Sequence, residues 1–264
     1  MAFLDSTAPV RCRLCGWSEV TLLGPVAPTH PAEFHTNEFT LQHCGHCDVV
    51  YLHPLPSAND LRLLYQQSMQ FTDAHYTDPA QVEKILAYYS GAARNLDLIP
   101  QNGARMLEIG AGLAWMSRAC KAIDPTVLTI AQDVSAECAD TCPWVDHYFV
   151  GTVDAIPDRG PYQMVSVTHV IEHLANPASM LRTISALVQP GGAVFITAPF
   201  RPSGWRRGDG ITAWRDYSYL HVPAHITYFS RQWFELQAAS HFSIAHWDAS
   251  HENGQAFELV LRRK

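Results

Sequence analysis

The sequence predicts an α/β fold in which mostly parallel strands alternate with helices, and three observations support this prediction. From Ala104 onward, short apolar runs of strand length alternate with longer segments of helical spacing. A glycine-rich turn joins the first of these strands to the next helix. The last two apolar runs are separated by Asn253-Gly254, a pair typical of tight turns between antiparallel strands. Strands separated by helices pair in parallel through right-handed crossovers, so we expect one sheet that ends in an antiparallel pair.

The individual elements follow from the same periodicities. The expected strands are 105–109, 127–132, 148–150, 164–169 and 193–198, with 241–250 and 255–262 as the closing pair. The expected helices between them are 112–122, 178–188 and 231–240. Two further helices are expected earlier, over 58–67 and 79–98. Ser57 is a candidate N-cap for the first of these, with Asp60 three residues on, and Pro79 fits the first turn of the second. Short β-like runs at 19–23 and 49–52 complete the pattern.

Composition sets limits on the class of protein. Hydrophobic residues make up 47% of the 264 residues, which is enough for a sizeable core. No run approaches the roughly 18 apolar residues of a membrane span, and Asp5 stands where a signal peptide would be apolar. We therefore expect a cytoplasmic protein without a membrane segment. The net charge of −7 argues against a nucleic-acid partner, because such a partner requires a positive surface.

Basic residues do gather in one stretch of the chain. Their pattern is typical of a solvated loop, although it also allows a local basic patch. The residues are Arg201, Arg206, Arg207 and Arg215.

The glycine turn has the sequence EIGAG, from Glu108 to Gly112, between the first expected strand and its helix. Glycines allow a tight turn and a close backbone approach to a ligand, and the helix N-terminus favours polar or anionic groups. Dinucleotide-binding turns follow the pattern GxGxxG, but here Trp115 stands where the last glycine belongs. The Glu108 carboxylate would repel a pyrophosphate and suits a cationic or amino-bearing ligand.

This turn, LEIGAG, resembles motif I of the class I methyltransferases that use S-adenosylmethionine (SAM). Four later features agree with that family in order and spacing: Asp133 at the end of the second strand, MVSVTHVIEHLANP at 164–177, LVQPGGAVFITAP at 187–199, and HITYFSRQWFELQAASHF at 225–242. The resemblance covers about residues 100–264. It implies a Rossmann-like, seven-stranded, mostly parallel sheet with an antiparallel last strand, and SAM as the methyl donor.

The resemblance also implies which residues contact SAM. Glu108 and the turn residues Gly110, Ala111 and Gly112 would line its methionine end. Asp133 would accept hydrogen bonds from the ribose, although the carboxylate of a helix N-terminus is an alternative reading. The remaining candidates are Val134 beside the adenine, Thr152 and Val153 as backbone contacts, and His169 near the sulfonium, where a packed histidine is the alternative.

The cysteines form two CxxC pairs, Cys12 with Cys15 and Cys44 with Cys47. Four thiolates in two such pairs predict a tetrahedral Zn²⁺ site, and because they leave no open position the zinc is expected to be structural. His43 and His46 flank the second pair and are alternative ligands. We therefore expect a zinc-ribbon subdomain at 1–56, a helical lid or linker at 57–100, and the SAM-dependent domain at 101–264. This arrangement resembles bacterial tailoring enzymes, including sugar C-methyltransferases.

Histidine is the side chain best suited to act as a base near neutral pH. The candidates are His169, His173, His221 and His225. The last two follow an aromatic-rich loop over residues 201–228, which is expected either to form a lid over the acceptor or to pack against the N-terminal helices.

Together these features predict methyl transfer to O, N or C of a small molecule, in a biosynthetic pathway such as antibiotic biosynthesis. The alternative is an RNA- or protein-directed methyltransferase, or a binding module, that uses the zinc ribbon for recognition. The few basic residues in 1–56 favour the first interpretation. The sequence indicates no oligomeric state.

Overall fold

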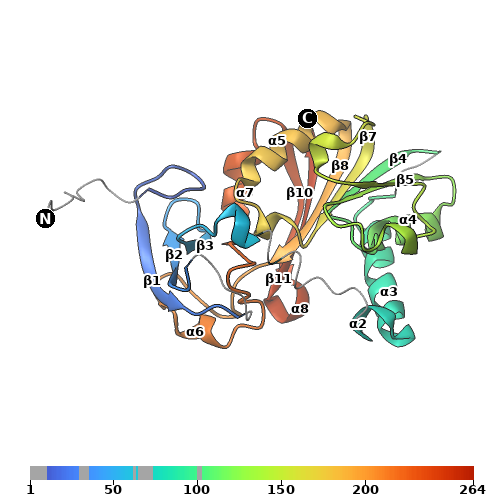
Figure 1. Cartoon of the computed structure of the whole chain (residues 1–264). Helices are drawn as coiled ribbons and strands as arrows, with labels where there is room; N and C mark the ends of the chain where they lie inside the picture. Colours follow the sequence, from blue (N-terminus) through green and yellow to red (C-terminus); the bar gives the residue numbers. More distant parts are fainter. Residues whose placement is uncertain (1–10, 30–35, 62–63, 65–73, 100–102) are drawn as a thin grey trace, which may run out of the picture.

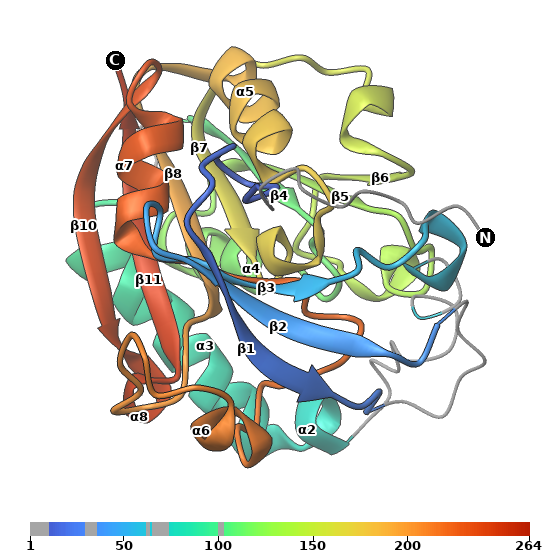
Figure 2. The same cartoon turned by 90° about the vertical axis from the view of Figure 1, so that its left-hand side faces the viewer.

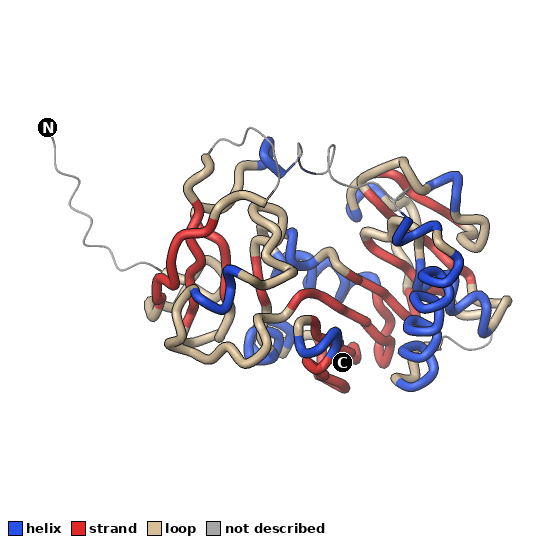
Figure 3. Tube along the Cα trace, turned by 90° about the horizontal axis from the view of Figure 1, so that it is seen from below, coloured by secondary structure: helices blue, strands red, loops and turns tan. Residues whose placement is uncertain are grey.

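The computed structural model describes residues 11–29, 36–61, 64, 74–99 and 103–264. It contains two sheets, one of seven strands and one of four (Figure 1). Seen from below, the small sheet and the helical layer around α3 (Pro79–Asn95) lie at opposite ends of the molecule (Figure 3). Within the described residues, no helix combines the length and apolarity needed to cross a bilayer.

The large sheet has the strand order β10-β11-β8-β7-β4-β5-β6. The five strands from β8 to β6 run parallel, whereas β11 runs antiparallel to both of its neighbours. The expected Rossmann-like sheet with an antiparallel last strand is therefore confirmed. Its strands are β4 (Arg105–Ile109), β5 (Leu128–Asp133), β6 (His147–Val150), β7 (Tyr162–Thr168), β8 (Val188–Pro199), β10 (Phe242–Ser250) and β11 (Ala256–Arg263).

Helices cover both faces of this sheet (Figure 1). On one face, α3 and α4 (Trp115–Ile123) share a buried cluster with Met106 of β4. On the other face, α5 (Pro177–Leu187) and α7 (Arg231–Ala238) share a cluster with Leu107 of the same strand. Neighbouring side chains of a strand point to opposite faces, so the uninterrupted apolar run of β4 is the expected result of burial on both sides.

The small sheet is antiparallel, with the order β1-β2-β3-β9. Its first three strands are β1 (Val20–Val26), β2 (Phe39–Cys44) and β3 (Val50–His53), which lie in front of the large sheet in Figure 2. The fourth strand, β9 (Thr227–Tyr228), comes from the other end of the chain and pairs with Val50 and Tyr51. The N-terminal sheet is thus completed by a segment that follows the large sheet's strand β8.

Several elements differ from the sequence prediction. β2 and β9 were not expected, and β8 begins at Val188 instead of 193. The Gly191-Gly192 pair lies inside β8, at a place where the pairing with β7 shifts its register between Tyr162 and Met164. The glycines therefore mark an irregularity within the strand and not its boundary.

The ends of two other segments also differ. α4 begins at Trp115, since residues 112–114 still belong to the glycine turn. Asn253 and Gly254 do have the positive φ typical of a turn, but they lie in α8 (His251–Gly254), one helical turn between β10 and β11. The connection between the closing strands is therefore a helical turn in place of the expected tight β-turn.

The N-terminal helices are described in part. Ser57 and Asp60 form the expected reciprocal cap: the Ser57 backbone N–H donates to the Asp60 carboxylate at 3.0 Å, and the Asp60 N–H donates to the Ser57 hydroxyl at 3.1 Å. Residues 58–61 are helical, and most of the rest of the expected helix lies outside the described residues. α2 (Ala74–Thr77) precedes α3, which Asp78 caps by accepting hydrogen bonds from Ala80 and Gln81.

Candidate active site

A cavity of about 810 Å³ opens at the edge of the large sheet where the central parallel strands end. Its walls come from the segments that follow these strands: Gly110 after β4, Asp133 at the end of β5, Thr152 after β6 and His169 after β7. The first turns of α5 close another side. Ligands of open parallel sheets bind outside the carboxyl ends of the strands, so this position is where a ligand is expected.

The glycine turn forms the floor of the cavity at Gly110. Its backbone has positive φ at Gly110 (61°), Gly112 (47°) and Ala114 (51°), a region that favours glycine. A Cβ atom added to Gly110 would lie 2.3 Å from Cγ2 of Val170, so no larger residue fits without moving that loop. Glycine at this position therefore allows Val170 to pack closely on the turn, beside the part of Gly110 that lines the cavity.

Glu108 lies behind the turn and does not line the cavity. Its carboxylate accepts hydrogen bonds from the N–H groups of Met116 (3.2 Å) and Ser117 (2.8 Å) and from the Ser117 hydroxyl (2.7 Å). Burial raises its pKa to about 7, against these hydrogen bonds, which lower it. The structure places Glu108 as a support for the start of α4.

Asp133 connects the turns that follow β4 and β5. One carboxylate oxygen accepts from the Gly112 N–H at 2.9 Å, and the other accepts from the Ser135 N–H at 2.8 Å. The residue is 7% exposed and lines the cavity, whereas Gly112 and Ala111 lie behind its wall. Ala111 packs instead with a small cluster that includes Cys138 and Cys142.

The other cofactor candidates from the sequence lie on the cavity wall. Val134 is 58% exposed there, and Thr152 and Val153 follow β6. Sequence reasoning missed Gln132, whose side chain donates to the Gly151 carbonyl at 2.5 Å and which also lines the cavity. It also missed the α5 side, where Asn176, Ser179, Met180 and Thr183 line the wall. The position of Gln132 next to Asp133, at the end of a strand, could have indicated that it lines the cavity. No local sequence pattern indicates that α5 lines it.

His169 projects into the cavity from the end of β7. Its side chain is 43% exposed, and its backbone has φ of 53°, an unfavourable conformation for a residue with a Cβ. The His169 N–H donates to the Thr197 carbonyl at 2.9 Å, which fixes the loop against β8. The ring lies parallel to Tyr219, with centroids 6.5 Å apart. Backbone strain of this kind is concentrated at functional sites.

The other candidate histidines gather around Glu172, a fully buried carboxylate in η3 (Ile171–His173). His173 lines the cavity, and its Nε2 lies 3.8 Å from Glu172 Oε1. His225 is buried, with its ring centroid 4.9 Å from that of His173 and 4.8 Å from that of His221. His221 and His225 do not line the cavity. The structure therefore brings three of the histidines around one acid, and a fourth, His221, stacks on the edge of that group.

Ionisation of this group is set by burial and by its own members. Burial raises the pKa of Glu172, but the nearby His173, His169 and His225 outweigh it and lower that pKa to about 2. Burial, followed by the effect of His173, lowers the pKa of His225 well below its ordinary value. At neutral pH the group therefore contains an ionised carboxylate and a neutral His225.

The four cysteines of the CxxC pairs converge between the two sheets. Cys12 Sγ lies 3.8 Å from Cys47 Sγ, and Cys15 Sγ lies 3.6 Å from Cys44 Sγ. All four sulfur atoms lie within 4.8 Å of one another. Zn–S bonds of 2.3 Å in a tetrahedron separate the sulfurs by about 3.8 Å, so the arrangement fits a four-thiolate zinc site. Neither His43 nor His46 belongs to the group.

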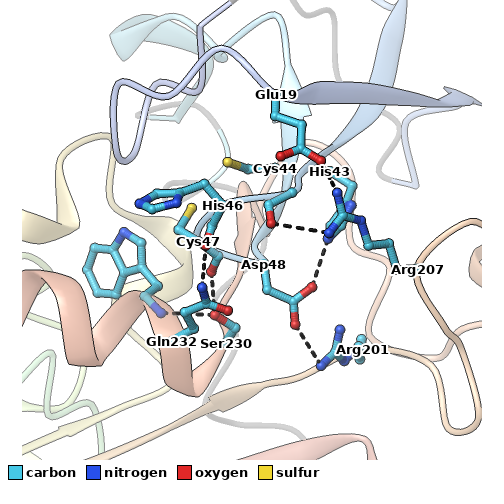
Figure 4. Close-up of polar contacts among 12 residues, drawn as sticks. Glu19, His43, Cys44, His46, Cys47, Asp48, Arg201, Arg207, Ser230 and Gln232 are labelled. Atoms are coloured by element: carbon cyan, nitrogen blue, oxygen red, sulfur yellow. Dashed lines mark hydrogen bonds and ion pairs between the residues drawn. The ribbon is translucent and has the colours of Figure 1, made fainter.

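The second CxxC pair is anchored to the rest of the molecule by polar contacts (Figure 4). The Asp48 carboxylate lies 2.8 Å from Nε2 of His43 and forms an ion pair with Nη2 of Arg201 at 3.1 Å. The Ser230 hydroxyl, at the start of α7, donates to the Cys47 carbonyl at 2.6 Å. Arg207 forms an ion pair with Glu19 of the N-terminal segment. Two arginines of the basic stretch thus join the cysteine cluster to the loop that follows β8.

The aromatic residues of that loop are mostly buried in the small sheet. Trp205, Trp214 and Tyr217 pack in one cluster with Phe39, Leu41 and Leu52, alongside α6 (Thr212–Arg215). Among the described residues, they therefore pack against strands of the N-terminal segment. Tyr219 differs, because it is only partly buried and lies beside the rings of His169 and His225.

Comparison with known proteins gives a match to a family described as a methyltransferase domain, over residues 59–241. Among curated proteins, the ubiquinone biosynthesis O-methyltransferase of Caulobacter vibrioides is 29% identical over 140 residues, which cover 48% of this chain and 54% of that protein. The enzyme of the same name from Shewanella halifaxensis is 28% identical over 102 residues, covering 36% and 43%. The chain thus spans about half the length of the curated relatives it matches.

Solved structures agree at the level of the fold. Coclaurine N-methyltransferase, bound to N-methylheliamine and S-adenosylhomocysteine, has a TM-score of 0.53 at 12% identity, covering 69% of this chain and 73% of that one. The CurJ carbon methyltransferase has a TM-score of 0.52 at 16% identity, covering 77% and 60%. The chain therefore belongs to the methyltransferase domain family, and its fold is that of a class I SAM-dependent methyltransferase.

Proposed function

We propose that the protein transfers the methyl group of SAM to an oxygen atom of a small-molecule acceptor in the cavity beside His169. The observation that carries this proposal is the cavity itself. Its volume of about 810 Å³ lies within the roughly 300–1,000 Å³ typical of small-molecule and cofactor sites. It opens at the strand ends, and it contains both the glycine turn and the exposed ring of His169.

SAM fits the turn side of this cavity. Gly110 lines the cavity, so the turn is positioned to contact the methionine part of the cofactor. The buried carboxylate of Asp133 suits the ribose hydroxyls, because hydrogen bonds to a charged acceptor are strong. The exposed side chain of Val134 offers an apolar surface to the adenine, with Thr152 and Val153 on the neighbouring wall.

His169 is the group best placed to accept a proton from the acceptor. SAM supplies an already activated methyl group, so the protein must orient the acceptor and remove its proton as the new bond forms. The Nδ1 atom of His169 lies 3.6 Å from Glu172 Oε1. An ionised carboxylate at that side of the ring stabilises the imidazolium that forms when the base takes up the proton.

The similarity to O-methyltransferases of ubiquinone biosynthesis supports an oxygen acceptor and a biosynthetic role. A phenolic hydroxyl suits this chemistry, because a histidine near neutral pH can assist its ionisation in the transition state. Recognition of RNA through the N-terminal segment receives no support from charge. Arg207 is already paired with Glu19, and Arg201 with Asp48.

We also propose that Cys12, Cys15, Cys44 and Cys47 hold a structural Zn²⁺ ion. The sulfur separations match a tetrahedral site, and four thiolates leave no position for a substrate. The cluster lies in a core shared by the N-terminal segment and α7, so the ion would join these parts.

Calorimetry with S-adenosylhomocysteine tests the cofactor site. We expect Asp133→Ala to bind about 10- to 100-fold more weakly, since loss of a charged hydrogen-bond acceptor costs about 1.5–3 kcal/mol. Asp140→Ala is the matched control, because Asp140 is exposed and outside the cavity. Absence of binding to the folded wild-type chain would sink the proposal.

The base is tested by formation of S-adenosylhomocysteine from SAM and a panel of phenols. His169→Gln should retain SAM binding while the rate falls by about 10²- to 10⁴-fold, the usual contribution of a general base. An unchanged rate in this variant would remove His169 from the mechanism. Transfer to amines but not to phenols would contradict the oxygen acceptor.

A further inference from the structure

Glu172 is a buried acid whose hydrogen-bonding capacity is not used. The residue has no exposed surface, and neither carboxylate oxygen accepts a hydrogen bond from the described residues. Two ring nitrogens lie just beyond hydrogen-bonding distance of Oε1, His169 Nδ1 at 3.6 Å and His173 Nε2 at 3.8 Å. A buried carboxylate without hydrogen bonds is costly, so such a group is normally paired or bound to a metal.

Two histidines beside this carboxylate are oriented by backbone carbonyls. His173 Nδ1 lies 2.8 Å from the Ala224 carbonyl, and His225 Nδ1 lies 2.7 Å from the Tyr219 carbonyl. A carbonyl oxygen only accepts, so each neutral ring must carry its proton on Nδ1 and its lone pair on Nε2. This is the arrangement by which metal-binding histidines are held in proteins.

The three side chains are also close enough to share one ion. One ligand atom from each of Glu172, His173 and His225 lies within 4.8 Å of the other two. In a tetrahedral site with bonds of 2.0–2.2 Å, ligand atoms are about 3.4 Å apart. The 3.8 Å between His173 Nε2 and Glu172 Oε1 is near that value, so small side-chain rotations complete the site.

We propose that Glu172, His173 and His225 form a second metal site, which binds a divalent transition metal through one carboxylate and two imidazoles. This ligand set suits Zn²⁺, Fe²⁺ or Co²⁺. Three protein ligands leave one coordination position open, unlike four thiolates. His173 lines the cavity, so the open position is adjacent to the space in which small molecules bind.

A second group of acidic and histidine side chains shows that closeness of potential ligands alone does not indicate a metal site. His246, Asp248 and Glu258 also lie within 4.8 Å of one another. The Glu258 carboxylate, however, already accepts from the Tyr88 hydroxyl at 2.6 Å and pairs with His251 at 2.8 Å. The Glu258 carboxylate is thus already used by these partners, whereas neither oxygen of Glu172 accepts a hydrogen bond from the described residues.

To test the proposal, the full chain is saturated with Co²⁺, and unbound metal is removed. The bound cobalt and the absorption spectrum of the protein are then measured. Thiolate-to-cobalt charge-transfer absorption reports the four cysteines, and elemental analysis reports all bound cobalt. We expect Glu172→Gln to bind one cobalt per chain fewer than wild type, with affinity at this site reduced on the order of 100-fold or more. The thiolate absorption should be the same in both. His246→Gln is the matched control and should retain the wild-type content.

Equal cobalt content in wild type and Glu172→Gln would overturn the proposal, as would a loss confined to His246→Gln. Should Glu172→Gln fail to fold, crystals of the wild-type chain soaked in Co²⁺ provide an independent measurement. An anomalous cobalt peak between Glu172, His173 and His225 is expected, and its absence from folded protein would refute the site. Binding of S-adenosylhomocysteine is measured on the same samples and tests the proposed cofactor site. Failure of the metal site and failure of the cofactor site therefore give different results.

Discussion

The two sheets of this protein are stabilised in different ways. The large sheet is covered on both faces by helices, and strands such as β4 and β8 are buried almost along their whole length. In the part of the chain that the structure describes, the core cluster of the small sheet contains no helix longer than the four residues of α6. The small sheet takes its core from the loop after β8, including Trp214 and Tyr228, and its last strand from β9.

This difference follows from how much apolar surface each part can bury. A short segment with three strands contains too little apolar area to offset its loss of conformational entropy, so it requires a metal or a partner surface. The small sheet has the cysteine cluster at one end and the aromatic loop at its centre. The cavity at the strand ends, in contrast, is formed mostly by segments of the large sheet, which is stabilised by its own core.

The largest expected effect comes from the cysteine cluster. Removal of the metal by a chelator, or Cys44→Ser, should unfold β1, β2 and β3 while β4, β5 and β7 stay protected. Structural Zn²⁺ contributes apparent binding free energies of about 10–16 kcal/mol in small zinc domains. Amide hydrogen exchange resolves the two sheets. Cys120→Ser is the control, since Cys120 is buried under the large sheet and lies outside the cluster. Equal loss of protection in both sheets would contradict separate stabilisation.

The next largest effect is expected at Trp214, which has no exposed surface and lies at the centre of the loop core. Trp214→Ala should reduce the free energy of unfolding by about 3–5 kcal/mol, because it leaves a large cavity. Denaturant unfolding measures this change. Trp17→Ala should change stability by less than about 0.5 kcal/mol, because Trp17 is 50% exposed. If amide hydrogen exchange in Trp214→Ala showed β4 opening before β1, Trp214 would not be a residue that stabilises the small sheet.

A smaller effect is expected at the glycine turn. Gly110→Ala introduces a Cβ at positive φ, which costs about 1–2 kcal/mol, and a contact with Val170, which adds about 1–3 kcal/mol. Gly208→Ala is a matched control, since Gly208 also has positive φ but open space around it. The difference in unfolding free energy between the two variants isolates the contact. Only Gly110→Ala should weaken binding of S-adenosylhomocysteine, and equal binding by both variants would argue against the turn as its site.

The smallest effect concerns Glu108, whose pKa burial raises from 4.5 to about 7. The folded state binds this proton more tightly than the unfolded chain, so the associated stability is present at low pH and is lost as pH rises toward 7. The side chain of the Glu108→Gln variant does not titrate, so its stability lacks this dependence on pH. Between about pH 5 and pH 7, wild type should lose about 2 kcal/mol relative to this variant. Thermal unfolding across that range tests the slope, and Glu137→Gln, at an exposed position, should match wild type.

The difference between the two sheets also explains which elements can be predicted from the sequence. Strands and helices of the large sheet follow local periodicity, and β4 lies where the pattern predicts it, at Arg105–Ile109. β9 has only two residues, and it exists because Val50 and Tyr51 offer it an edge. No local pattern specifies such a pairing, because the partner lies at the far end of the chain.

The site is predictable to a similar degree. The glycine turn and Asp133 are adjacent to strand ends, so their position at the cavity follows from the topology. The role of Glu108 beside Ser117 depends on how the turn bends into α4, which spacing does not define. The group around Glu172 joins residues after β7 to residues before β9, and only the folded chain brings them together.

The pairing of β3 with β9 has a consequence for synthesis of the protein. The four cysteines all lie before Asp48 in the sequence, so the cysteine cluster can assemble early on the ribosome. The edge of β3 pairs with Thr227 and Tyr228, which are synthesised only after strands β4 to β8 of the large sheet. Contacts between such distant residues form slowly, since a long loop must close first. Until then Phe39 and Leu41 lack the cover of Trp214 and Tyr228, so the nascent N-terminal segment exposes apolar surface that favours aggregation.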